Sequence, residues 1–313
     1  MDVTARLRHG LIPAVPVPFI GQDLDLASQD KYARWISEQP VAGVAVWAHT
    51  GRGLYLSVAQ RATILTSWRQ RLPEKVIVAG AGGALNARSD SEYLQSAIEM
   101  AEQAKQLGAD ALLCYAPVRY RGRDDQDALC LSYHAALTEI GLPLILFYLY
   151  EAAGGISYSR KLLSELLATE KVIGIKIATL DSVMTYQDVA QLCRAVAPEK
   201  LVITGEDRFL GYSLMCGADA ALIGMGAAFT NVQNELLRSF YDGDHSSFIA
   251  ANALVDRLAQ ATFLQPMEGY IARMSYILSK QGIFNAGSWH DPWGPKITPA
   301  ELAHLDAIIT ELT

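Results

Sequence analysis

Short apolar runs alternate with longer amphipathic segments from the start of the chain to about residue 230. Each run is too short for a helix and is apolar throughout, which is typical of a strand buried on both faces of a parallel sheet. The segments between the runs, such as 89–107 and 181–196, repeat their apolar positions with helical spacing. The predicted strands are Leu11–Val15, Val41–Val46, Val76–Ala79, Ala111–Cys114, Leu144–Phe147, Val172–Ile175, Leu201–Ile203 and Ala220–Ile223.

Eight strand–helix units in succession predict a (β/α)8 TIM barrel, because right-handed crossovers make all strands of the sheet parallel. A doubly wound open sheet is the alternative, since the number of units does not by itself close a barrel. Beyond about residue 230 the apolar strands stop, and helical patterns follow at 246–263, 267–281 and 299–312. We therefore expect a barrel over residues 1–230 and C-terminal helices over residues 231–313 that pack on it.

Composition narrows the class of protein. A chain of 313 residues with 51% hydrophobic and 19% charged residues can bury a large core and is not typical of disorder. The net charge of −7 argues against nucleic acid or an anionic membrane as a partner, and no apolar stretch reaches the roughly 18 residues of a spanning helix. The four cysteines form no CxxC pair, so we expect no zinc site and no disulfide framework. The N-terminus lacks the apolar core of a signal peptide, so the cytoplasm is the expected location.

One lysine stands out from this pattern. Lys176 interrupts the apolar segment 172–177, which reads as a fully buried strand. Burying an ammonium group without a partner is costly or lowers its pKa, and an unprotonated lysine is a nucleophile that forms Schiff bases with ketones. The alternative is a lysine whose ammonium group reaches solvent at the end of the strand.

Polar and glycine-rich segments follow several predicted strands. The clearest are 47–53 after the second strand, 80–83 after the third and 204–207 after the seventh. In a TIM barrel these segments meet at the carboxyl ends of the strands, where such enzymes carry their active sites. Lys176 ends the sixth strand at the same rim, which favours a functional role for it.

Several motifs occur in an order and spacing that together resemble one family. They are Pro13–Phe19, Asp23–Asp25, Ala48–Arg52, Ala79–Gly83, Gly108–Asp110, Ile173–Lys176 and Thr204–Asp207. The chain resembles the dihydrodipicolinate synthase / N-acetylneuraminate lyase family of class I pyruvate-dependent aldolases. The resemblance implies a TIM barrel, a Schiff base on Lys176, a 2-keto acid as substrate, no cofactor, and a homo-oligomer, either a tetramer or a dimer.

The chain departs from the family at the positions that handle protons. The family's catalytic tyrosine at the end of strand 5 corresponds to Phe147, whose ring has no proton to transfer. Tyr148 is adjacent, but strand alternation points it to the opposite face unless a bulge intervenes. The second family tyrosine corresponds to Arg119 or Tyr120, and Ala152 replaces an arginine of the synthases. We therefore expect an activity other than dihydrodipicolinate synthesis.

The loop after the second strand is also altered. Thr50 and Gly51 keep the hydroxyl and the flexible backbone that the resemblance assigns to the keto-acid carboxylate, and Gly205 lies in a further matching segment. His49 replaces a threonine and could act as a general acid and base, although a structural histidine is the alternative. Arg52 replaces a glutamate and, like Arg119, could bind a second anionic group through two hydrogen bonds, the alternative being a solvated basic loop.

These residues support three interpretations. The leading one is a Schiff-base-forming lyase, an aldolase or dehydratase, that acts on pyruvate or a pyruvate-containing 2-keto acid. In it, His49 with Tyr148 or Tyr120 takes over the work of the missing tyrosine. The second is a catalytically impaired family member that binds a keto acid as a sensor or scaffold, which Phe147 motivates. The third is a barrel enzyme that binds flavin or phosphate.

Overall fold

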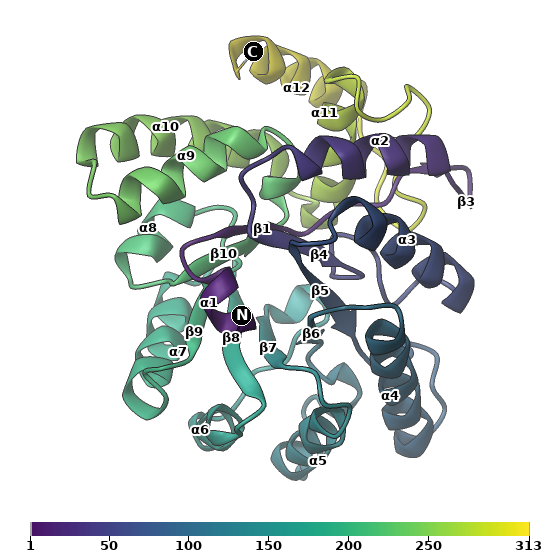
Figure 1. Ribbon diagram of the computed structural model, residues 1–313, viewed down its shortest axis with the longest axis vertical. Coiled ribbons are helices and arrows are strands. Elements are labelled where there is room, and N and C mark those ends of the chain that lie inside the picture. The colour runs from purple at the N-terminus through teal and green to yellow at the C-terminus, as the bar shows by residue number, and fades with distance from the viewer. Residues whose placement is uncertain (1, 313) are drawn as a thin grey trace.

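The computed structural model describes residues 2–312, and in it eight parallel strands form a barrel surrounded by helices (Figure 1). Neighbouring strands pair in the order β1-β10-β9-β8-β7-β6-β5-β4. A bridge between Ala14 and Ala45 brings the two ends of this sheet together, which confirms the barrel and excludes the open sheet. The strands are β1 Leu11–Pro13, β4 Gly43–Val46, β5 Val76–Ala81, β6 Ala111–Cys114, β7 Leu144–Leu149, β8 Val172–Ala178, β9 Leu201–Thr204 and β10 Ala220–Ile223.

Helices follow the strands and pack around them (Figure 1). They are α2 Leu26–Ser37, α3 Val58–Arg71, α4 Asp90–Gln106, α5 Gln126–Thr138, α6 Arg160–Ala168, α7 Val183–Val196, α8 Leu210–Met215 and α9 Thr230–Tyr241. A hairpin of β2 Phe19–Ile20 and β3 Asp23–Leu24 follows β1. Short 3-10 turns follow three of the strands: η1 Val118–Tyr120 after β6, η2 Glu151–Ala153 after β7 and η3 Met225–Ala227 after β10. Side-chain caps stand at the N-termini of several of these helices. At α3, Ser57 and Gln60 each accept a hydrogen bond from the other's backbone N–H group.

Alternating side chains divide each strand between two layers. The barrel interior holds one cluster, to which Ile145, Phe147 and Ile203 contribute. The layer between the barrel and the helices holds the other, which includes Ile175 and Ile177. Helix α1, Val3–Leu7, closes the amino-terminal end of the barrel, where the Leu7 side chain joins the interior cluster. The carboxyl ends of the strands are therefore left to form a site.

The C-terminal third of the fold is helical, as the sequence predicts. Helix α10, His245–Thr262, packs against α9, and α12, Pro299–Leu312, packs against both α10 and α11, Tyr270–Lys280 (Figure 1). A 3-10 turn, η4 Met267–Gly269, leads directly into α11. The division at residue 230 stays a prediction. Within residues 2–312, no helix is both long and apolar enough to cross a membrane.

Candidate active site

Lys176 projects into the barrel interior near the carboxyl end of β8. Its neighbours along the strand, Ile175 and Ile177, face the helices, so alternation turns Lys176 inward. Its backbone lies opposite Phe147 of β7, and its Nζ atom is 4.3 Å from the centre of that ring. Gly205 lies against the lysine, because a Cβ atom there would stand 2.6 Å from Lys176 Cε. Only 6% of the lysine is exposed, so its amine meets the enclosed space of the barrel and little bulk water.

Burial makes this amine unusually acidic. Desolvation lowers the pKa of Lys176 to about 8, although the negative charges of Asp207 and Glu206 act in the opposite direction. Near pH 7 roughly a tenth of the amine is unprotonated, on the order of 100-fold more than in a solvated lysine. The unprotonated amine is the nucleophilic form, so the environment of Lys176 suits attack on a carbonyl carbon.

Two buried carboxyl groups stand near the amine. Asp207 accepts a hydrogen bond from the Met225 backbone N–H at 2.7 Å, and burial raises the pKa of this carboxyl to about 7. Glu206 accepts from the backbone N–H of Thr179 at 2.6 Å and of Leu180 at 2.8 Å. Glu206 therefore braces the backbone after β8, while Asp207 supplies a charge that favours the ammonium form of Lys176.

A small cavity of about 30 Å³ lies beside the amine, which leaves room for a compact group. The residues around it come from the ends of several strands and from the C-terminal helices: His49, Thr50, Phe147, Leu149, Tyr150, Lys176, Ala178, Leu180, Gly205, Asp207, Gly224, Phe263 and Tyr270. The structure thus brings four predicted site residues, His49, Thr50, Phe147 and Gly205, next to Lys176.

Tyr270 is the site residue that sequence reasoning missed most completely. Its hydroxyl lies 2.9 Å from Thr50 Oγ1, and its ring stacks on Phe263 with the ring centres 4.5 Å apart. Burial raises the pKa of Tyr270, so its hydroxyl stays protonated and can donate a hydrogen bond. Tyr150 also lines the cavity, from the residue before η2. Tyr150 directly follows β7, the fifth predicted strand, so its position in the sequence indicated the rim. Tyr270 lies in a C-terminal helix, and no local pattern indicated that it reaches the site.

The loop after β4 holds His49, Thr50 and Arg52 in a bent backbone. Trp47 has φ 55° and Arg52 has φ 51°, a left-handed conformation that is uncommon for residues other than glycine. Gly51 packs closely, because a Cβ atom there would stand 2.9 Å from the backbone oxygen of Val15. Local strain of this kind gathers at functional loops.

A larger cavity of about 280 Å³ adjoins the small one, and His49 lines both. Glu268, on η4, binds His49 Nε2 at 2.9 Å and accepts from Arg52 Nη1 at 2.6 Å. Burial raises the pKa of Glu268, but the hydrogen bond from His49 and the charges of His49 and Arg52 outweigh it and bring the pKa down to about 2. The cluster therefore holds Glu268 ionised and fixes the His49 ring.

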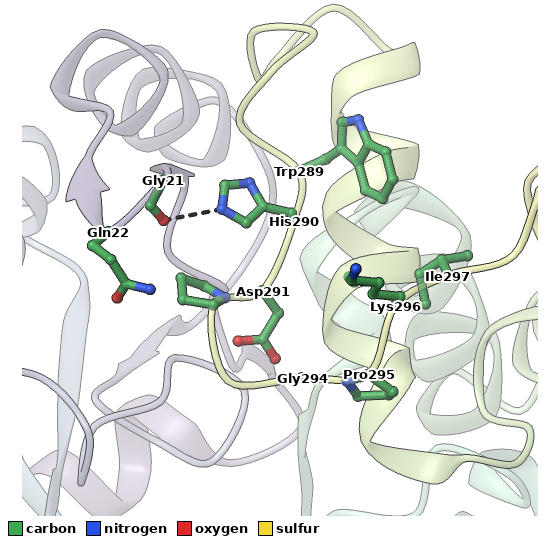
Figure 2. A pocket seen from close by; sticks show the side chains of 11 residues that line it. Gly21, Gln22, Trp289, His290, Asp291, Gly294, Pro295, Lys296 and Ile297 are labelled. Atoms are coloured by element: carbon green, nitrogen blue, oxygen red, sulfur yellow. Dashed lines mark hydrogen bonds between the residues drawn. The ribbon is translucent and has the colours of Figure 1, made fainter.

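Arg52 has a second carboxylate partner from the C-terminal segment. It donates to Asp291 Oδ2 from Nε at 2.9 Å and from Nη2 at 2.6 Å. Figure 2 shows the segment around Asp291, which lines a surface cavity of about 530 Å³. In this segment His290 Nε2 lies 3.0 Å from the Gly21 backbone oxygen. The guanidinium that sequence reasoning assigned to an anionic substrate group is thus already paired with two carboxylates.

Besides Gly51, three predicted residues do not line either cavity. Tyr148 faces the helices and packs on Tyr158, with ring centres 5.7 Å apart, because β7 continues its alternation past Phe147 without a bulge at that point. Tyr120 is buried among the rings of the helical layer, 5.6 Å from Tyr93. Arg119 donates to Asp90 at 2.7 Å at the start of α4. This geometry corrects the expectation that these three residues reach the keto acid.

Within the described residues, no group of three or more His, Cys, Asp or Glu side chains is arranged to hold a metal ion. The polar groups that line the lysine cavity include the amine of Lys176, the hydroxyls of Thr50, Tyr150 and Tyr270, the imidazole of His49 and the carboxyl group of Asp207.

Comparisons with known proteins agree with the resemblance. The dihydrodipicolinate synthetase family matches residues 7–311. The chain is 25% identical over 296 residues to N-acetylneuraminate lyase 2 of Escherichia coli O6:H1, covering 91% of this chain and 88% of that protein. It is 27% identical over 283 residues to 4-hydroxy-tetrahydrodipicolinate synthase of Hyphomonas neptunium, covering 88% and 89%. The structure of a prophage protein of the dihydrodipicolinic acid synthase family from Escherichia coli K12, in complex with pyruvate, shares its fold with a TM-score of 0.83 at 21% identity, covering 97% of this chain and 98% of that one.

Proposed function

The chain belongs to the dihydrodipicolinate synthetase family, and we propose that it uses Lys176 to form a Schiff base with pyruvate or a pyruvate-containing 2-keto acid. Members of this family are class I aldolase-type lyases, and the chain is an enzyme of that class. The observation that carries the proposal is the buried amine of Lys176. Its pKa is lowered, and it lines a small cavity at the carboxyl end of the barrel strands, where TIM barrels carry their active sites.

The reaction begins when the unprotonated amine of Lys176 attacks the ketone carbon. The resulting carbinolamine takes up a proton on its hydroxyl and loses water, which leaves a protonated imine, the iminium. This cation accepts the electron pair of the C3–C4 bond in retro-aldol cleavage, or of a C3–H bond before aldol addition or loss of water. After cleavage, the enamine that is left takes up a proton at C3 and becomes an iminium again. Water hydrolyses this iminium, which releases the keto acid and restores the amine.

Thr50 and the backbone near Gly51 support binding of the carboxylate, and Gly205 shapes the space beside the lysine. The Thr50 hydroxyl lines the lysine cavity and is held by Tyr270 at 2.9 Å. Gly205 leaves the space in which the lysine reaches its substrate, since a side chain there would overlap Lys176 Cε. Phe147 then serves as an apolar wall against the iminium, 4.3 Å from the nitrogen.

We assign proton transfer at the substrate hydroxyl to His49. Its ring lies where the two cavities join, which is where the bond between the keto-acid part and the rest of a substrate would lie. Glu268 binds Nε2 and orients the ring, as a carboxylate orients a catalytic histidine in other enzymes. Tyr270 and Tyr150 replace Tyr148 and Tyr120 as the hydroxyl groups that complete the relay, because they line the lysine cavity.

The second substrate of the lysine-pathway synthase does not suit this site. Phe147 and Ala152 replace the tyrosine and the arginine that the synthases use, and Arg52 is paired with Glu268 and Asp291. Losing a positioned acid or base costs about 10²–10⁴-fold in rate. Efficient condensation of pyruvate with aspartate semialdehyde would contradict this part of the proposal.

Reductive trapping tests the central claim. Incubation with pyruvate and borohydride should add one reduced pyruvyl group, found by mass spectrometry on the peptide that contains Lys176. The variant Lys176→Ala should not be labelled, whereas Lys171→Ala, which removes an exposed lysine beside the same strand, should be labelled normally. Labelling that survives Lys176→Ala would overturn the assignment.

The alternative function, a keto-acid sensor or scaffold, is favoured by Phe147, which removes the family's proton donor. Both functions allow the imine, so turnover separates them. A screen of 4-hydroxy-2-keto acids that releases pyruvate supports the lyase, and a trapped imine without turnover of any such compound supports the sensor. The His49→Ala variant should keep the imine and lose about 10²-fold or more in turnover, if the histidine carries the proton.

We also propose that the protein is a homo-oligomer, a tetramer or a dimer, and that it works in the cytoplasm. The typical assembly of the family supports the first proposal, and the general location of its members supports the second. Light scattering after size-exclusion chromatography measures the assembly; a monomer at micromolar concentration would refute it. Fractionation of cells that express the chain tests the location.

A further inference from the structure

We propose that the 280 Å³ cavity beside the lysine cavity binds an uncharged aromatic group, so that the second substrate is an aromatic aldehyde or the matching half of a hydroxy-keto acid. This inference rests on the proposed Schiff-base function of Lys176. It goes further by assigning the chemistry of the second substrate, which lies in the larger cavity while the keto-acid part occupies the smaller one.

Most of the residues that line the cavity have apolar or aromatic side chains. Leu54, Tyr55, Leu85 and Trp293 line it, with Tyr115 among the deeper residues. Tyr55 and Leu85 are 47% and 50% exposed, and large apolar side chains that stay exposed around a hollow are typical of a binding site. The ring centres of Tyr55 and Trp293 lie 5.5 Å apart. An aromatic ligand in the cavity could therefore pack against the faces or edges of these two rings.

Several polar side chains of this cavity are already paired. The Tyr115 hydroxyl donates to the Trp47 backbone oxygen at 2.9 Å, which leaves its ring to contact a ligand. Glu268 is bonded to both His49 and Arg52. The Tyr115 hydroxyl and the Glu268 carboxylate are thus engaged and do not serve the several hydroxyls of a sugar, and a buried substrate hydroxyl without a partner is unfavourable.

In the described part of the chain, no unpaired lysine or arginine lines the cavity to bind a second carboxylate. Arg52 is the only lysine or arginine among the residues that line the cavity, and Glu268 and Asp291 each accept a 2.6 Å bond from it. Both edges of the Arg52 guanidinium are thus occupied, so a second carboxylate would have to displace Glu268 or Asp291 to pair with it. Arg119, the other predicted anion-binding residue, is held by Asp90 outside the cavity. The pairing of Arg52 therefore selects against anionic aldehydes.

Binding of unreactive analogues tests this inference without requiring turnover. The probes are methyl 4-(hydroxymethyl)benzoate and 4-(hydroxymethyl)benzoate, which share a ring and differ in charge. We expect calorimetry to show the ester binding about tenfold or more tighter than the carboxylate. Leu85→Ala should weaken ester binding by about fivefold because it removes apolar contact. Leu54→Lys should raise carboxylate affinity and reverse the preference.

Equal or tighter binding of the carboxylate by the unmodified protein would overturn the inference, as would failure of both probes to bind at millimolar concentration. Pyruvate trapping on Lys176 is measured in parallel on the same samples. Loss of trapping with retained ester preference would sink the Schiff-base proposal alone, whereas normal trapping with the wrong preference would sink only the inference about the second substrate.

Discussion

Replacing Asp207 by asparagine should make the Lys176 amine more acidic and speed imine formation near neutral pH. The charge of Asp207 is the largest influence that raises the pKa of Lys176 against the effect of burial. Asparagine removes that charge but retains an oxygen that can accept the 2.7 Å hydrogen bond from the Met225 backbone N–H. The change therefore perturbs the electrostatics of the amine with little change in shape.

The size of the effect follows from the titration of the lysine. With a pKa of about 8 for Lys176, roughly a tenth of the amine is unprotonated at pH 7. Loss of a neighbouring opposite charge lowers a lysine pKa by on the order of one unit. About half of the amine would then be unprotonated at pH 7. Because Asp207, with a pKa of about 7, carries only part of its charge at that pH, trapping should be faster by up to about fivefold, with the rate at high pH unchanged.

The assay is the initial rate of reductive labelling by pyruvate and cyanoborohydride, followed by mass spectrometry across roughly pH 6 to pH 10. The parent protein should give a midpoint near pH 8 and Asp207→Asn a lower one. The control Asp30→Asn removes an exposed carboxylate paired with Arg71 and should leave the midpoint in place. An unchanged or higher midpoint in Asp207→Asn would refute the view that this carboxylate stabilises the ammonium form.

Three further variants test the geometry of the site. Gly205→Ala should reduce pyruvate labelling by about 10–100-fold, since its Cβ atom would stand 2.6 Å from the lysine side chain; normal labelling would show that the lysine moves aside easily. Tyr270→Phe should lower kcat/KM for the keto acid by about tenfold, whereas the control Tyr148→Phe, on the outer face of β7, should change it less than about twofold. A larger effect of Tyr148→Phe would contradict the assignment of Tyr270 to the site. Glu268→Gln should lower kcat by about 10–100-fold while imine trapping persists, because the His49 ring loses its charged partner; equal loss of trapping would indicate a structural role instead.

Local patterns determined the framework of this protein. A strand that is apolar on both faces is recognisable from a few consecutive residues, and its alternation predicts which side chains face inward. The inward direction of Phe147 and the outward direction of Tyr148 follow from this rule, and the structure has both. Because parallel strands end at one rim, the sequence also predicted that Lys176 and His49 lie near each other.

Tertiary packing decided the charges and the second half of the site. Glu268, Tyr270 and Asp291 follow the last strand, and no local pattern indicates that the C-terminal helices carry them over the rim to His49, Thr50 and Arg52. An arginine is free to bind a substrate only if the fold leaves it without a carboxylate partner. For Arg52 the partners come from segments more than 200 residues away in the sequence. Periodicity reports which face of an element is buried, whereas the partner of a buried charge is chosen only when distant elements pack together.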